Sequence, residues 1–318
     1  MFHSWYHAAD ETSDRKRKEN FDKMKNSKLD GLFKKNIAGW MLILPTVLVF
    51  IVFVWRPIII GVFYSFFDLN GFTPVRFVGV DNYIRVLSDT NFLKTLWNTV
   101  QYVLWSLVLG LPLPFVAAVM LNEIRFGKQY FKITSYLPCV LPGMAVYLLW
   151  TMIYGESSTG LINSVLNLFG IENMKFLSNS KFVIPYIILM MTWQCFGSTM
   201  VMYLATLQSV DTSLYEAARI DGANFWQRIK AVLFPHCRGI ILLLAVRQII
   251  GVFAITEQPM VMTGGGPNGA SLSLGLTNYY YAFKYGQMQN SLAIGVVSFV
   301  FLVGLTVVYF TLDKKINE

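Results

Sequence analysis

Six long apolar stretches dominate the sequence and restrict the fold more than any other feature. Each has about the 20 residues that an α-helix needs to cross the ~30 Å hydrocarbon core of a bilayer. Apolar and polar residues do not alternate strictly within them, which argues against a β-barrel. We therefore predict an all-α integral membrane protein whose six transmembrane helices lie near residues 38–62, 96–121, 132–154, 183–207, 239–261 and 289–312.

The amino-acid composition agrees with a membrane protein. Hydrophobic residues make up 55% of the chain and charged residues 14%, whereas a soluble domain carries about 25% charged residues. A net charge of +8 in a soluble protein would point to nucleic acid. In a membrane protein the same excess marks the cytoplasmic loops. We therefore expect membrane lipid, and no nucleic acid, around this chain.

The distribution of Lys and Arg indicates the orientation of the helices. With a cytoplasmic amino terminus, 18 of the 26 Lys and Arg residues lie in cytoplasmic segments and six lie in external loops. Cytoplasmic loops of membrane proteins carry such an excess. We predict that both termini are cytoplasmic, with a polar extension over residues 1–36, no cleavable signal peptide, and a transmembrane domain over 37–318.

The segment 210–238, between the fourth and fifth apolar stretches, is predicted to form two short helices that meet at a glycine corner. Asp211 or Thr212 can cap the first helix, and Gly222 can end it because glycine adopts positive φ. Asn224 can begin the second helix, and Pro235 marks the return to the membrane. Small alanines and charged residues flank the corner. It could dock into a partner protein or lie on lipid headgroups, and the residues alone leave both readings open.

The same segment resembles the signature loop of the membrane subunits of binding-protein-dependent ABC importers. That signature has Glu-Ala-Ala, a glycine six residues after the glutamate and a proline thirteen residues further on, as at Glu216, Gly222 and Pro235. The longer form with Asp221-Gly222-Ala223 resembles the carbohydrate-importer branch. Further stretches resemble maltose-permease-like subunits: FVGVDNY at 77–83, WNTVQYV at 97–103 and MTGGGPNGAS at 262–271.

The resemblance implies the type I ABC importer permease fold and a set of partners. These are a second, homologous permease subunit forming a heterodimer, two ATP-binding subunits and an extracytoplasmic solute-binding protein. The signature loop would be a coupling element held by an ATP-binding subunit. Its residues would be Glu216, Ala217, Ala218, Arg219, Asp221, Gly222, Ala223, Phe225 and Pro235, with Phe225 and Pro235 securing the corner against the transmembrane body.

The chain has no P-loop of its own. That motif needs G-x-x-x-x-G-K-[ST] to cradle phosphates, and the Gly127-Lys128 pair lacks the first glycine and the final Ser or Thr. We therefore predict a non-catalytic subunit that binds no cofactor, with ATP and Mg used by its partners.

Polar and aromatic residues near the predicted helices are candidates for the transport route, because burying them in lipid is costly. Contacts between helices also concentrate such residues, so both readings stay open. The candidates are Trp193, Gln194, Ser198, Arg247, Gln248 and Glu257, and Arg56 lies in the first predicted helix. The segment Thr263, Gly264, Gly265, Gly266 and Pro267 is either a turn or a contact for the binding protein.

These observations predict a permease subunit of a sugar or oligosaccharide importer in the bacterial cytoplasmic membrane. One alternative is a non-sugar cargo such as glycerol phosphate. Another is an ion-gradient-driven transporter, which would need paired intramembrane acids. A membrane enzyme is disfavoured because the three histidines do not cluster. The three cysteines share no metal spacing, and we expect them to be small buried hydrophobes.

Overall fold

The computed structural model describes residues 37–124, 126–210, 213, 218 and 220–317. The predicted extension over residues 1–36 therefore lies outside the described residues. The chain divides after Gly61 into two compact units. Within the described ranges, five helices are long and apolar enough to cross a membrane, and one bent pair of helices raises the number to six.

The first unit carries most of the first candidate span, Gly39–Tyr64. The span widens into a π-helical turn just ahead of Pro57, with the Arg56 N–H bonded to the carbonyl of Ile51. Proline lacks a backbone donor and crowds the carbonyl four residues back, so a wider turn accommodates it. The elements are α2 (Ile37–Phe50), η1 (Ile51–Trp55) and α3 (Arg56–Tyr64).

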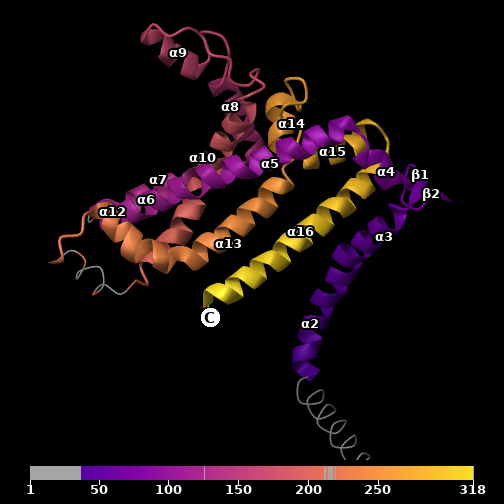
Figure 1. The fold of residues 1–318 in the computed structure, drawn as a ribbon, viewed down its shortest axis with the longest axis horizontal. Coiled ribbons are helices and arrows are strands. Elements are labelled where there is room, and N and C mark those ends of the chain that lie inside the picture. The colour runs from indigo at the N-terminus through magenta and orange to yellow at the C-terminus, as the bar shows by residue number, and fades with distance from the viewer. Residues whose placement is uncertain (1–36, 125, 211–212, 214–217, 219, 318) are drawn as a thin grey trace, which may run out of the picture. The chain divides into compact units, whose positions relative to one another are not determined.

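The second unit is a helical bundle in which α10 (Val183–Leu207) packs against α5, α6, α7 and α13 (Figure 1). α10 coincides with the predicted fourth span, and the sixth span, Met288–Thr311, agrees with the prediction to within one residue. The helices of this unit are α4 (Asp81–Leu87), α5 (Thr90–Gly110), α6 (Pro112–Glu123), α7 (Lys128–Val140), α8 (Gly143–Ile153), α9 (Leu161–Leu168), α10, α12 (Phe225–Arg228), η2 (Ile229–Leu233), α13 (Phe234–Phe253), α14 (Glu257–Thr263), α15 (Leu274–Tyr279), η3 (Tyr280–Lys284) and α16 (Met288–Asn317).

The predicted third span is not one straight helix. α7 and α8 meet at an angle of 98°. Leu141, between them, has extended backbone angles, because a residue before proline is driven out of the helical region and Pro142 follows. α7 packs along α10, whereas α8 packs against α14. The two halves of this apolar run, α7 and α8, therefore pack against different helices.

The predicted fifth span is wrong at both ends. The helix starts earlier than residue 239, because the candidate span is Trp226–Phe253. It also stops at Phe253, eight residues before the predicted end. Ser273 donates a hydrogen bond to the carbonyl of Ile255, and Gly275 lies close to the same carbonyl. The Ile255 carbonyl therefore finds its partner in Ser273, the cap of α15, rather than in a longer helix.

A small β-hairpin departs from the predicted all-α class. β1 (Phe67–Asn70) pairs antiparallel with β2 (Thr73–Phe77), with Phe67 opposite Phe77. The buried Asn82 amide donates to the carbonyls of Ser65 and Phe67, at 2.9 and 3.0 Å. The hairpin is therefore anchored to the start of α4 and leaves the helical bundle unchanged.

Candidate functional site

A cavity of about 210 Å³ lies between α10 and α13, beside the break that separates α5 from α6 at Leu111. Residues spaced three and four apart share one face of a helix, and both helices follow this rule at the cavity. Polar and small residues line its walls: Cys195, Ser198 and Thr199 from α10, and Arg247, Gln248 and Gly251 from α13.

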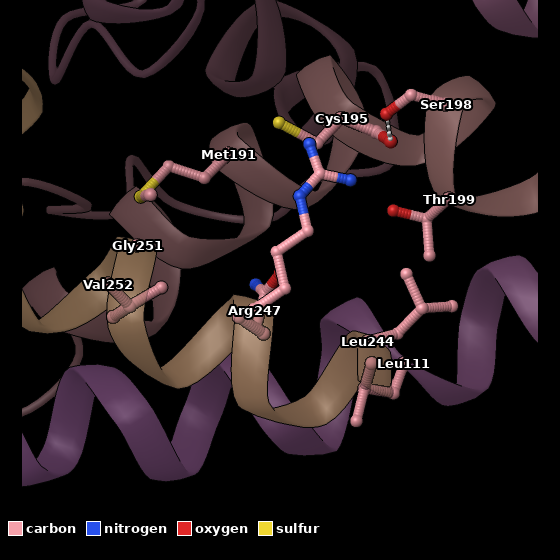
Figure 2. A pocket seen from close by; sticks show the side chains of 10 residues that line it. Leu111, Met191, Cys195, Ser198, Thr199, Leu244, Arg247, Gly251 and Val252 are labelled. Atoms are coloured by element: carbon pink, nitrogen blue, oxygen red, sulfur yellow. Dashed lines mark hydrogen bonds between the residues drawn. The ribbon is translucent and has the colours of Figure 1, made fainter. Parts of the chain in front are cut away.

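Arg247 is the charged residue among those that line the cavity. Figure 2 shows its side chain extending from α13 toward Cys195 on α10. Its Nη1 donates to the sulfur of Met202 at 3.5 Å, and thioether sulfur is a weak acceptor. Among the described residues, no Asp or Glu oxygen lies within ion-pair distance of this guanidinium. The cavity therefore carries a positive charge that this part of the chain does not neutralise.

The amide of Gln248 occupies space that a glycine leaves open. A Cβ on Gly110 would lie 2.9 Å from Nε2 of Gln248 and 3.8 Å from Oγ1 of Thr192. Because Gly110, at the end of α5, has no side chain, it leaves room for the Gln248 amide beside α5 and α10. The amide is held at the cavity by packing rather than by a hydrogen bond to another described residue.

The structure brings together half of the predicted pathway residues. Ser198, Arg247 and Gln248 line the cavity, whereas Trp193, Gln194 and Glu257 do not. Trp193 packs edge-on against Trp150 of α8, with ring centroids 5.5 Å apart.

The placement of Glu257 and of the cysteines differs from the prediction. Glu257 is exposed in the first turn of α14, beside the Tyr147 hydroxyl that accepts a hydrogen bond from Gln258 at 3.1 Å. It therefore lies beyond the fifth span. Cys237 is buried as expected and Cys139 is half-buried. Cys195 is exposed and lines the cavity, which corrects the expectation that it is buried.

The glycine corner forms as the sequence predicts. Gly222 has a φ of +77°, and the N–H of Ala223 donates to the carbonyl of Ala218 at 3.0 Å. A left-handed glycine with this six-to-one hydrogen bond is the Schellman motif that ends a helix. Asp221 and Gly222 are exposed at the turn. The corner is therefore a defined change of direction with an open outer surface.

The next helix begins with a reciprocal cap. Asn224 Oδ1 accepts the N–H of Gln227 at 2.9 Å, and Gln227 Oε1 accepts the N–H of Asn224 at 2.8 Å. This arrangement satisfies two otherwise unpaired donors at the start of the helix. The prediction that Asn224 begins the second helix is confirmed.

The second helix is not short, which corrects the prediction of a loop reaching residue 238. α12, the π-helical η2 and α13 run on as one span from Trp226 to Phe253. Pro235 lies inside it, two residues after η2, where the N–H of Phe234 reaches the carbonyl of Ile229. As in the first span, the wider turn accommodates a proline without ending the helix.

Three residues of this helix anchor the corner to the bundle. Ile229, Leu233 and Cys237 are buried, four residues apart, in a cluster with side chains of α6 and α10. Arg228 of the same helix forms an ion pair with Glu123 of α6 at 3.6 Å. The helix that follows the corner is therefore packed against α6 and α10.

The structure locates only part of the predicted coupling set. Ala218 and Ala223 are half-buried, and Asp221 and Gly222 are exposed. Pro235 is exposed, so Ile229 and Leu233, rather than this proline, secure the helix. The calls on Glu216, Ala217 and Arg219, on the side chain of Phe225, and on the cap at Asp211 or Thr212 lie outside the described residues.

The segment from Thr263 to Pro267 is a tight turn at the end of α14, not at the end of the fifth span. Gly264 and Gly265 have φ of +60° and +87°. A Cβ on Gly265 would lie 2.5 Å from a methyl carbon of Leu272, so both conformation and space require glycine. Gly264 is exposed and Gly265 is buried, while Thr263, Gly266 and Pro267 are half-buried. The segment is a turn, but it follows α14 rather than leaving the fifth span as the sequence suggested, and a contact with the binding protein stays a prediction.

One face of α5 holds the chain that follows this turn. The Asn98 amide donates to the carbonyls of Gly269 and Leu272 at 2.8 and 3.0 Å. The Tyr102 hydroxyl donates to Ser271 at 3.0 Å, and Lys94 donates to the carbonyl of Asn268. Lys94, Asn98 and Tyr102 are four residues apart and so share one helix face. The loop is thus fixed to a candidate span.

We expect Asn98→Ala to lower the free energy of unfolding by about 2 kcal/mol, because two half-buried carbonyls lose their donor. Thermal unfolding of the purified chain in detergent measures this change. Gln101→Ala, which removes an amide three residues along the same helix without a hydrogen bond in the described structure, is the matched control. Equal shifts for both variants would contradict the role given to Asn98.

The family profile described as "Binding-protein-dependent transport system inner membrane component" matches residues 110–318. The chain belongs to this family. It is a non-catalytic permease subunit of a bacterial ABC importer and a multi-pass inner membrane protein.

Relatives that align with most of this permease are themselves transport system permease proteins. The arabinooligosaccharides transport system permease protein AraP of Bacillus subtilis is 30% identical over 89% of this chain and 91% of its own length. The multiple sugar-binding transport system permease protein MsmF of Streptococcus mutans is 31% identical, covering 87% of this chain and 95% of its own. A crystal structure of a bacterial ABC transporter for the acidic polysaccharide alginate has the same fold, with a TM-score of 0.81, 23% identity, and coverage of 92% of this permease and 100% of that chain.

Sequence reasoning missed several residues that build the site of this permease. Cys195, Thr199 and Gly251 line the cavity, and Asn98 holds the loop. The stripes Cys195-Ser198-Thr199 and Arg247-Gln248-Gly251, at helical spacing, carried a signal for the cavity. No comparable signal linked Asn98 to residues more than 170 positions later in the chain.

Proposed function

We propose that this permease forms part of the membrane route for a sugar or oligosaccharide, opened and closed by ATP hydrolysis in partner subunits. The names of AraP and MsmF, which refer to arabinooligosaccharides and to multiple sugars, support a carbohydrate cargo. A cavity with an amide, two hydroxyls and a guanidinium among apolar neighbours offers the few convergent polar groups typical of small-molecule sites.

One observation carries the coupling part of this proposal: a single helix joins the corner to the cavity. The span Trp226–Phe253 begins four residues after Gly222 and contains Arg247, Gln248 and Gly251. At a rise of 1.5 Å per residue, the helix runs about 33 Å from Phe225 to Arg247. A displacement of the corner is therefore delivered directly to the cavity wall.

The proposed arrangement in the membrane follows from charge. The excess of Lys and Arg supports cytoplasmic termini and a cytoplasmic corner, where Ala218, Asp221, Gly222 and Ala223 would meet an ATP-binding subunit. Glu216, Ala217, Arg219 and Phe225 complete the proposed contact. Two ATP-binding subunits use ATP and Mg, and a second, homologous permease completes the route.

The turn at Thr263–Pro267 would then face the outer side of the membrane, where the solute-binding protein lies. Gly264 is its exposed residue, and Asn268, the next residue along the chain, is exposed as well. Because α5 holds the following chain rigidly, this surface is available for contact with an extracytoplasmic solute-binding protein without first having to fold.

The test is reconstitution of the full complex in proteoliposomes with its solute-binding protein. We expect ATP-dependent uptake of a carbohydrate and ATP hydrolysis that rises when the loaded binding protein is added. Uptake of glycerol phosphate but of no sugar would contradict the proposed cargo and leave the proposed ATP-driven mechanism standing. Uptake without ATP that collapses with an ion gradient would overturn the mechanism.

A further inference from the structure

We propose that the Arg247 cavity binds an anionic group, a carboxylate or a phosphate, on the transported molecule. The inference rests on the proposed function, because it takes the cavity to be part of the transport route. It adds the charge of the cargo, which a permease for neutral sugars does not require.

The charge of the cavity is the first observation. Arg247 lies within the candidate span Trp226–Phe253 and is exposed at the cavity. A charged group inside a membrane span is costly unless it meets a partner or water. Its contact in the described structure is the weak acceptor Met202 Sδ, at 3.5 Å, and none of the residues that line the cavity is acidic. The guanidinium thus has its strong donors available for an oxyanion.

The neighbouring polar groups form the second observation. Among the described residues, neither the Gln248 amide nor the Thr199 hydroxyl has a hydrogen-bond partner, although both line the cavity. The Ser198 hydroxyl donates to the carbonyl of Cys195 at 2.8 Å, which leaves its oxygen as an acceptor. An oxyanion would accept hydrogen bonds from the Arg247 guanidinium and the Gln248 amide. An adjacent sugar hydroxyl would donate to the Ser198 oxygen.

The size of the cavity restricts how much of the cargo it holds. A volume of about 210 Å³ is below the ~300–1,000 Å³ of sites that enclose a drug-sized ligand. It suits one charged group with part of the ring that bears it. A guanidinium presents parallel N–H donors that match a planar carboxylate or a phosphate face. The remaining units of a longer cargo would lie outside this cavity.

Cys195 provides a direct readout of occupancy, because its thiol is exposed at the cavity. The purified complex, with Cys139→Ser in this chain, is treated with N-ethylmaleimide in the absence of the solute-binding protein. The Cys195 thiolate adds to the double bond of this uncharged reagent, and the mass of the chain reports the reaction. Cys237 is buried and serves as an internal background.

The probes are di-galacturonate, glycerol 3-phosphate and neutral digalactose. We expect the anionic probes to slow the labelling of Cys195 at concentrations at least about tenfold below those needed with digalactose. Di-galacturonate acting alone would identify a carboxylate, and glycerol 3-phosphate acting alone would identify a phosphate. Arg247→Gln should remove the preference, and Arg247→Lys, which keeps the charge but not the parallel donors, should retain only part of it.

Three results would overturn the inference. They are equal protection by neutral and anionic probes, protection by none of the probes, and an anion preference that Arg247→Gln leaves unchanged. Loss of complex assembly in Arg247→Gln, together with absent anion protection in the unsubstituted complex, would show that Arg247 pairs with the second permease instead. The proposed function fails only if ATP does not drive uptake, so the two outcomes are separable.

Discussion

Gly222→Val is expected to reduce ATP-driven uptake at least tenfold while the chain still enters the membrane and assembles. Gly222 has a φ of +77°, where a residue with a Cβ is strained by about 1–2 kcal/mol and a β-branched residue is a genuine outlier. Beyond its chain neighbours, no atom of the described residues lies within 4 Å of a Cβ at this position, so the substitution disturbs the turn and not the bundle. Uptake into proteoliposomes and the yield of assembled complex are measured together.

The matched control for this prediction is Gly239→Val. Gly239 lies in α13, has ordinary helical angles, and also has open space around a Cβ. Its replacement costs little, because valine adopts this conformation readily in a helix. Uptake that stays normal in Gly222→Val, or that falls equally in both variants, would refute a special role for the corner.

Gly197→Ala should lower the free energy of unfolding by about 3 kcal/mol and reduce the yield of folded protein. A Cβ on Gly197 of α10 would lie 2.2 Å from the backbone carbonyl oxygen of Ser135 in α7 and 2.5 Å from Cα of Tyr136. Backbone atoms cannot rotate away as a side chain can, so the two helices must separate. Small residues permit such close approach of helices in membranes.

Thermal unfolding in detergent measures this effect, with Gly304→Ala of α16 as the control. Gly304 is helical, with nothing within 4 Å of a Cβ, and alanine favours helix over glycine. We expect Gly304→Ala to leave the midpoint unchanged or raise it. A Gly197→Ala chain that is as stable as the Gly304→Ala chain would rule out the close α7–α10 contact.

Hydrophobic length predicts where a chain crosses the bilayer but not how the crossing bends. The fourth span was delimited correctly because its apolar run ends where α10 ends. The third run spans the bend at Leu141, since apolar residues continue on both sides of Pro142. The fifth run continues past Phe253 because α14 contributes the apolar residues Val261 and Met262, which pack into the protein core rather than into lipid. The free energy of transferring apolar residues out of water is favourable in both lipid and the protein core, so hydrophobicity alone does not distinguish the two.

Local chemistry predicted the corner, whereas the cavity needed the fold. Gly222 and Asn224 have roles set by neighbours within five residues. Trp193 and Ser198 both looked suitable for a transport route. Because they are five residues apart, their side chains point in directions about 140° apart around the axis of α10. Ser198 therefore lines the cavity while Trp193 faces Trp150.

Ile229, Leu233 and Cys237 are buried among side chains of α6 and α10. This packing determines which helices would move when an ATP-binding subunit displaces the corner. A close-packed interior transmits strain rather than absorbing it. The moving part is then a block of three helices, and a force on one turn of backbone rotates or tilts the whole block. Weakening this packing, for example with Leu233→Ala, would let the helix of the corner move without α6 and α10. ATP hydrolysis would then be uncoupled from transport, although neither the corner nor the cavity is altered.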